Sequence, residues 1–143
     1  MDRTEFDEVV ERYHRAADEF INGNPEPYKA MFSRRDDVTL GNPFGPVGRG
    51  WEQISGIMER ASALYRDGED FTAENITTYV TPELAFIVEV ERFRTKIAGR
   101  DDLSSVALRT TSIFRPEDDG WKIIHRQADT VTSTRPAESV IQQ

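Results

Sequence analysis

The chain has 143 residues, which suits one domain around a single core, and its 37% hydrophobic and 31% charged residues are typical of globular proteins. Its net charge of −8 and isoelectric point near 4.8 argue against nucleic-acid binding, because contacts to phosphates need a basic face. With no cysteine and only two histidines, it is expected to form no disulfide, to bind no metal and to need no cofactor.

The first predicted element is a helix over residues 6–20, where apolar side chains recur at helical spacing and form one stripe. His14 lies beside the stripe and is expected at the surface. This segment is acidic as well as amphipathic, so it is not a secretory signal, and no apolar run approaches the ~20 residues that span a bilayer. We therefore expect a cytoplasmic protein without a membrane partner. The stripe consists of Phe6, Val9, Val10, Tyr13, Ala17 and Phe20.

Three shorter elements are predicted before residue 70. Asn24-Pro25 can cap a short second helix, which would bury Tyr28, Met31 and Phe32. Residues 37–40 are expected to form a short strand, and the run GNPFGP at 41–46 is expected to be a rigid turn that cannot continue it. A third helix is predicted from Trp51 to the stop signal Asp67-Gly68.

After Gly68 the apolar period changes to two, which is typical of strands. Four long strands are predicted, at 70–80, 84–97, 103–115 and 121–132, and their short connectors favour antiparallel neighbours. Helices gathered first and strands gathered last indicate an α+β fold with the helices on one face of the sheet. We expect one domain over residues 1–132 and a loose tail at 133–143.

Two regions resemble known families. The stretch VTLGNPFGPVGRGWEQI at 38–54 resembles the ketosteroid isomerases, which carry an Asp-Pro-Phe-Gly turn followed by a Gly-x-Glu-Gln-Ile helix start. The segments LRTTSIFR at 108–115 and GWKIIH at 120–125 resemble the wider SnoaL-like group. This resemblance, which runs from the first helix to Thr132, implies the nuclear transport factor 2-like fold. In that fold a cone-shaped, curved antiparallel sheet (a cystatin-like α+β barrel) wraps three N-terminal helices around a pocket for a small apolar organic molecule.

Two departures from the isomerases bear on activity. Asn42 stands where their general base is an aspartate, and an amide accepts no proton near neutral pH. Their oxyanion-hole tyrosine falls on Ala16, with Tyr13 one turn earlier. Steroid isomerisation by that mechanism is therefore not expected. Asn42 and Tyr13 are candidate ligand contacts, with a turn-fixing amide and a core aromatic as the alternatives, and Phe44 in the same turn is a further candidate.

The resemblance also implies which strand faces line the pocket. Matching Gly120 to the equivalent glycine of the isomerases turns Trp121, Ile123, His125, Gln127 and Asp129 toward it. The second long strand would contribute Leu84, Phe86, Val88 and Val90, whereas Glu89 and Glu91 are expected to be solvated or paired across strands.

The third long strand is ambiguous. Hydrophobicity alone would bury the face with Val106, Leu108, Thr110, Ser112 and Phe114. The resemblance favours the other face, because limonene epoxide hydrolases carry an Arg-x-Asp pair where this chain has Arg109-x-Thr111, and a second aspartate where it has Asp129.

These residues suggest a catalytic hypothesis. Arg109 would pair with Asp129 across adjacent strands inside the cavity and keep it ionised, so that Asp129 could orient a water or a substrate hydroxyl. His125 would be a general acid or base. The alternatives are a structural ion pair and a hydrogen-bonded core histidine. The predicted ligand contacts are Tyr13, Asn42, Phe44, Phe86, Val88, Thr111 and Gln127.

Two functions are compatible with the sequence. The first is cofactor-independent acid–base chemistry, of an isomerase, cyclase, dehydratase or hydrolase type, on a small and largely apolar molecule. The alternative is a non-catalytic ligand-binding or dimerisation module, like the association domain of calcium/calmodulin-dependent kinase. A homodimer through the sheet is expected, because a second copy would cover apolar side chains that are otherwise exposed. Those side chains are Ile87, Phe93, Phe114 and Ile124.

Overall fold

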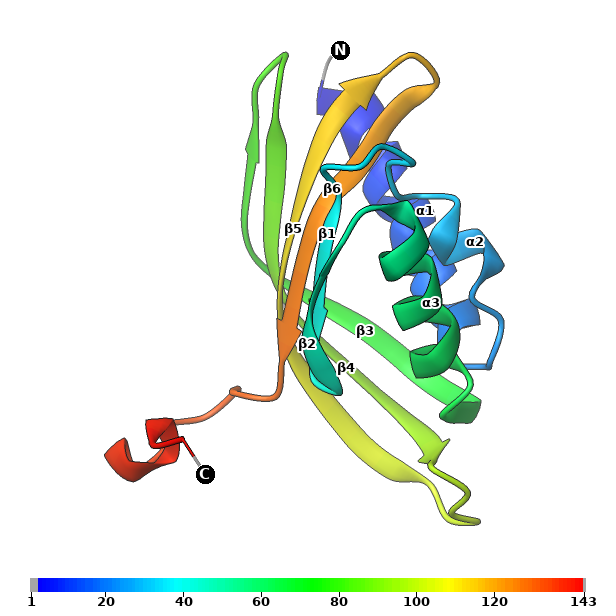
Figure 1. The fold of residues 1–143 in the computed structure, drawn as a ribbon, viewed down its shortest axis with the longest axis vertical. Coiled ribbons are helices and arrows are strands. Elements are labelled where there is room, and N and C mark those ends of the chain that lie inside the picture. The colour runs from blue at the N-terminus through cyan, green and yellow to red at the C-terminus, as the bar shows by residue number, and fades with distance from the viewer. Residues whose placement is uncertain (1–2, 143) are drawn as a thin grey trace.

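The computed structural model describes residues 3–142, which form three α-helices, six strands and a short 3-10 helix. The strands build one sheet in the order β2-β1-β6-β5-β4-β3, in which only the β1–β6 pair is parallel. The sheet is curved and unclosed, and the helices lie together on one side of it (Figure 1). The predicted α+β fold is confirmed. The elements are α1 (Arg3–Phe20), α2 (Glu26–Lys29), β1 (Thr39–Asn42), β2 (Gly45–Arg49), α3 (Trp51–Ser62), β3 (Tyr65–Val80), β4 (Ala85–Ile97), β5 (Ser104–Glu117), β6 (Gly120–Asp129) and η1 (Ala137–Val140).

The stripe of α1 packs against the sheet, whose helix-facing side is called the inner face here. Phe6 and Tyr13 are fully buried in this interface. The ring of Phe6 meets the edges of Phe114 and Trp121 at centroid distances of 5.0 and 5.3 Å. Such edge-to-face contacts add to the hydrophobic gain of burial, so aromatic packing fixes α1 on the sheet.

Several boundaries differ from the prediction, and two of these differences change the sheet. Residues 45 and 46, expected to end a rigid turn, instead begin β2, which runs to Arg49 and pairs with β1. Pro46 is compatible with this strand because β2 is at the sheet edge, where a missing N–H costs no ladder hydrogen bond. β3 begins at Tyr65, before the predicted helix end, and the left-handed residues Asp67 and Asp70 help to break its period of two. Register shifts, typical of β-bulges, interrupt β3 three times and bend it.

A β-bulge reverses the face of β6. Ile113 of β5 lies opposite His125, but the next residue, Phe114, lies opposite Ile123, so Ile124 has no partner residue. Trp121 and Ile123 are therefore buried before the bulge, and Arg126 and Ala128 after it. The prediction that His125, Gln127 and Asp129 share the inner face with Trp121 is wrong, because strict alternation does not continue through a bulge.

The inner faces of β4 and β5 are also the reverse of those implied by the resemblance. The buried side chains of β4 are Ala85, Ile87, Glu89, Glu91, Phe93 and Thr95, and those of β5 are Leu108, Thr110, Ser112 and Phe114. The prediction that Leu84, Phe86, Val88, Val90 and Thr111 face the helices is therefore wrong. For β5, the alternative based on hydrophobicity alone is confirmed. The patch predicted from Ile87, Phe93 and Phe114 is buried against the helices instead.

Within residues 3–142, none of the helices has the length and apolarity that a bilayer crossing requires.

Candidate functional site

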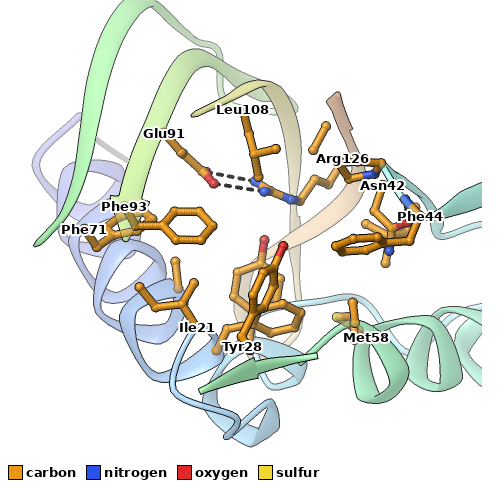
Figure 2. Close-up of a pocket in the computed structure, with 17 residues that line it drawn as sticks. Ile21, Tyr28, Asn42, Phe44, Met58, Phe71, Glu91, Phe93, Leu108 and Arg126 are labelled. Atoms are coloured by element: carbon orange, nitrogen blue, oxygen red, sulfur yellow. Dashed lines mark hydrogen bonds and ion pairs between the residues drawn. The ribbon is translucent and has the colours of Figure 1, made fainter. Parts of the chain in front are cut away.

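An apolar cavity lies between the three helices and the inner face of the sheet (Figure 2). The part of it that the centres of water-sized molecules can occupy measures about 50 Å³. Most lining side chains are apolar, and among the described residues the charged ones are Glu91 and Arg126. Predominantly apolar walls with a few polar groups are typical of small-molecule sites. The apolar lining consists of Ala17, Phe20, Ile21, Leu40, Pro43, Phe44, Met58, Ala61, Phe71, Phe93, Leu108 and Ala128.

The charged groups of the cavity form a buried ion pair. Arg126 Nη1 and Nη2 donate to the two carboxylate oxygens of Glu91 at 2.9 and 3.0 Å. The side chains are only 8% and 3% exposed. Burial alone would lower the pKa of Arg126, but the neighbouring Glu91 carboxylate outweighs it and holds that pKa well above its ordinary value. The cavity thus contains a buried arginine whose guanidinium is paired with a buried carboxylate.

Hydroxyl groups continue from this pair toward the helices. Tyr13 Oη accepts a hydrogen bond from Arg126 Nη1 and lies 3.0 Å from Ser112 Oγ and 3.2 Å from Tyr28 Oη. The rings of Tyr13 and Tyr28 are stacked, with centroids 5.5 Å apart. Ser112, Tyr13 and Tyr28 therefore form a hydrogen-bonded chain that ends at the cavity, since Tyr28 is a lining residue.

The donors and acceptors in this row of hydroxyl groups can be arranged in two ways. Tyr13 Oη has one proton, so it can donate to Tyr28 while accepting from Ser112, or donate to Ser112 while accepting from Tyr28. In the first arrangement the proton of Tyr28 is free for a ligand, and in the second a lone pair is free. The cavity end of the chain can therefore bind an acceptor or a donor.

The tyrosines of the site stay protonated near neutral pH. Burial is the main cause that raises the pKa of Tyr13 and, more strongly, that of Tyr28. Burial also raises the pKa of Tyr65, another lining residue, to about 12. Each of these side chains is thus a neutral hydroxyl rather than a phenolate.

Two of the predicted ligand contacts line the cavity. Asn42 Oδ1 accepts a hydrogen bond from the Phe44 N–H at 2.9 Å, which fixes the turn between β1 and β2. The Phe44 ring is 47% exposed and lies 6.0 Å from the ring of Tyr65, so it borders the mouth. Tyr13, the third predicted contact, does not line the cavity. Its hydroxyl is hydrogen-bonded to two residues that do, Tyr28 and Arg126.

The predicted catalytic pair forms on the opposite side of the sheet, called the outer face here. Arg109 Nε and Nη2 donate to the two carboxylate oxygens of Asp129 at 3.0 and 2.7 Å, across β5 and β6. Their side chains are 57% and 30% exposed, and neither lines the cavity. The hydrogen bonds from Arg109 are the main cause that lowers the pKa of Asp129. The prediction that this pair lies inside the cavity is wrong, because the β6 bulge turns Asp129 outward.

The other predicted residues share this outer face. His125 Nδ1 lies 2.7 Å from Thr39 Oγ1, and partial burial lowers its pKa. The cross-strand partners Val88, Thr111 and Gln127 form one row, and Phe86, Ile113 and His125 form the next. None of these side chains is brought to the cavity.

Sequence reasoning missed the residues that provide the polar groups of the cavity. Glu91 was expected to be solvated or paired across strands, Tyr28 was predicted only to be buried by the second helix, and Arg126 was not singled out. Glu89, also expected to be solvated, is buried and contacts His14 Nε2 at 2.7 Å. The sequence of β4 contains a signal for this burial. Ile87 and Phe93 lie on the same face as Glu89 and Glu91 and flank them, so a face that buries the apolar pair also buries the two glutamates.

Across residues 3–142, no group of three or more histidine, cysteine, aspartate or glutamate side chains is arranged so that it could hold a metal ion.

Comparisons with known proteins agree with this architecture. A family model described as a SnoaL-like domain matches residues 7–131, and no curated protein sequence matches the chain. One similar solved structure is a ketosteroid isomerase-like protein from Erwinia carotovora atroseptica, at 14% identity and a TM-score of 0.74, with 91% of this chain and 96% of that chain covered. A nuclear transport factor 2-like superfamily protein from Salmonella enterica shares 18% identity at a TM-score of 0.75, and 94% of each chain is covered. A protein with a cystatin-like fold from Novosphingobium aromaticivorans shares 20% identity at a TM-score of 0.65, with 99% and 90% covered. At these identities the likeness is one of fold.

Proposed function

Because this chain belongs to the SnoaL-like domain family, we propose that it binds one small, largely apolar molecule in the cavity between its helices and the inner face of its sheet. The observation that carries the proposal is the convergence of polar groups on an otherwise apolar space. Arg126 and Glu91 lie along one side of this space and Tyr28 stands on the opposite side, while Phe71, Phe93 and other apolar side chains line the rest (Figure 2). A ligand with one oxygen-bearing end and an apolar body matches this division.

The oxygen atom of the ligand would bind at Tyr28. Arg126 donates to Tyr13, so the electron density of Tyr13 Oη is drawn toward the cation and its proton becomes a better donor to Tyr28. Tyr28 is polarised in turn and would donate to a carbonyl or hydroxyl oxygen of the ligand. The apolar walls would bind the ligand body through burial of its surface.

Acid–base catalysis on the same ligand is the second candidate. The observation that favours it is the chain from Ser112 through Tyr13 to Tyr28, because a preorganised donor beside a buried cation stabilises negative charge that develops on a ligand oxygen. One solved neighbour is described as ketosteroid isomerase-like. Binding without turnover is nevertheless the better supported proposal. Asn42 cannot be a base, and both carboxylate oxygens of Glu91 accept hydrogen bonds from Arg126.

A thermal-shift screen of phenols, enones, lactones and steroids tests the proposal. Ligands that raise the melting temperature are then incubated at high protein concentration and analysed for products. Binding without product supports a binding protein, and product formation supports the catalytic candidate. If no compound shifts the melting temperature or changes the NMR signals of the lining residues, the proposed function is wrong.

Tyr28→Phe should weaken the binding of 4-ethylphenol about 2- to 12-fold, because it removes one hydrogen bond worth about 0.5–1.5 kcal/mol. NMR titration of wild type and variant measures the two dissociation constants. Tyr79→Phe is the matched control, since Tyr79 is exposed and stacks on Phe86 of the outer face. An equal loss in both variants would show that the hydroxyl of Tyr28 does not hold the ligand.

The partner that we propose for the outer face is a second copy of the chain. Phe86, Val88 and Ile113 form an apolar centre in two adjoining cross-strand rows. The charges beside it occur as ion pairs, Arg109 with Asp129 and Arg92 with Glu74, so this area is balanced although the chain carries −8. A balanced apolar surface allows self-association that the rest of the acidic molecule would oppose.

Wild-type protein should therefore sediment as a dimer at micromolar concentration, and Ile113→Asp should sediment as a monomer with unchanged secondary structure. The aspartate would place an unpaired charge in the centre of the contact, where burial is costly. Val140→Asp is the control, because Val140 is 87% exposed on η1, away from the sheet (Figure 1). A monomeric wild type at these concentrations would rule out the dimer.

A further inference from the structure

We propose that the cavity selects uncharged ligands that bear a hydroxyl or carbonyl group and rejects carboxylates, because Glu91 already occupies the carboxylate-binding side of Arg126. This inference rests on the proposed function, since it names the chemical class of the ligand for the same cavity.

An unpaired arginine in an apolar cavity would select anions. The guanidinium matches a carboxylate through two parallel N–H donors, which makes it a preferred binding group for ligand carboxylates. In this protein Nη1 and Nη2 already bind both oxygens of Glu91, and the second proton of Nη1 is directed to Tyr13. The fork formed by Nη1 and Nη2 is therefore filled by the protein itself, and a ligand anion is left with only the side-on donors, Nε and the second proton of Nη2.

Glu91 would also repel a ligand carboxylate directly. Both members of the pair line the cavity, and they are joined by hydrogen bonds of 2.9 and 3.0 Å. Any anion that approaches Arg126 consequently approaches Glu91 to a similar distance, so attraction and repulsion nearly cancel. The anion would still lose its hydration in an apolar space, and this cost has no compensating partner.

The hydroxyl groups that remain for a ligand are neutral. Tyr28 Oη bonds to Tyr13 and has capacity for one more partner. Tyr65 Oη makes no hydrogen bond with any residue in the range 3–142, and Tyr65 borders both the cavity and the open depression outside it. Both hydroxyls remain protonated, as their raised pKa values indicate. Alcohols, phenols, ketones and amides match such groups without bringing a charge.

The test compares ligands that have the same body and different charge. At pH 7, 4-ethylphenol and 4-ethylbenzamide are neutral, whereas 4-ethylbenzoate is an anion. The wild type is expected to bind either neutral compound at least tenfold more tightly than 4-ethylbenzoate in NMR or calorimetric titrations. Glu91→Gln keeps the shape of the side chain and removes its charge, so it should improve 4-ethylbenzoate binding at least tenfold and thereby remove the preference for 4-ethylbenzamide over 4-ethylbenzoate.

Glu74→Gln controls for the loss of one negative charge. Glu74 pairs with Arg92 on the exposed outer face, so this variant should keep the wild-type preference. Comparable wild-type binding of 4-ethylbenzamide and 4-ethylbenzoate overturns the inference and leaves the proposed cavity function standing. That comparison needs no variant, so it decides the matter even if Glu91→Gln does not fold. If none of the three compounds, nor any hit of the wider screen, binds the wild type, the proposed function fails and the inference fails with it.

Discussion

Replacing Arg126 with methionine is expected to lower the free energy of unfolding by about 3–5 kcal/mol at pH 7, because it leaves a buried carboxylate without its partner. Glu91 is buried on the inner face, and both of its oxygens accept from Arg126. A domain of this size has a total stability of about 5–15 kcal/mol, so this single change removes a large part of it. Urea unfolding followed by circular dichroism measures the difference.

Two controls separate the unpaired charge from the loss of packing. The double variant Arg126→Met with Glu91→Met should recover much of the loss, since an apolar pair of similar volume removes the buried charge. Arg109→Met breaks an ion pair of the same geometry on the outer face, where solvent screens it, and should cost much less. Equal losses in Arg126→Met and Arg109→Met would contradict the assignment of inner and outer faces.

The fold was largely predictable because the pattern of apolar residues is clear over long elements. The stripe of α1 and the alternation in the long strands identify an α+β domain, and the short connectors identify neighbouring strands. Strand boundaries were predicted wrongly where prolines or bulges remove the usual sequence pattern of a strand. Pro43 and Pro46 made residues 41–46 look like a turn alone, yet an edge strand tolerates proline, and β2 forms. β3 is largely exposed and bulged, so its first residues lack the alternation that marks a strand.

The site was harder to predict than the fold, because one extra residue exchanges the two faces of a strand. The bulge at Ile124 has no signal in the sequence, and it decides that Arg126 rather than His125 or Gln127 faces the cavity. Burial of Glu91 depends on Arg126, which lies 35 positions away in the chain, so neither residue reveals its partner by local spacing. An isolated charged side chain is costly to bury, so a glutamate or arginine considered alone is predicted to be at the surface. Glu91 and Arg126 are buried because each is the partner of the other.

Phe114→Ala should lower the stability of the folded chain much more than Phe86→Ala, which tests the face assignment without a ligand. Phe114 is fully buried and meets the rings of Phe6 and Tyr13 edge to face at 5.0 and 5.9 Å. Its truncation should cost about 3–5 kcal/mol, as expected for a phenylalanine deleted from a packed core. Phe86 is only partly buried on the outer face and stacks on exposed Tyr79, so its truncation should cost far less within one chain.

If the outer face forms the proposed dimer, urea unfolding at several protein concentrations can separate a loss of interface contacts from a loss of packing within one chain. Any loss in Phe86→Ala that comes from the interface should depend on protein concentration, because association stabilises the folded chain by mass action. The loss in Phe114→Ala comes from packing within one chain and should not depend on it. If instead Phe86→Ala were the more damaging change at every concentration, Phe86 would lie in the core. The inner face would then be the one that the family resemblance implied, and Arg126 would have to lie outside the cavity.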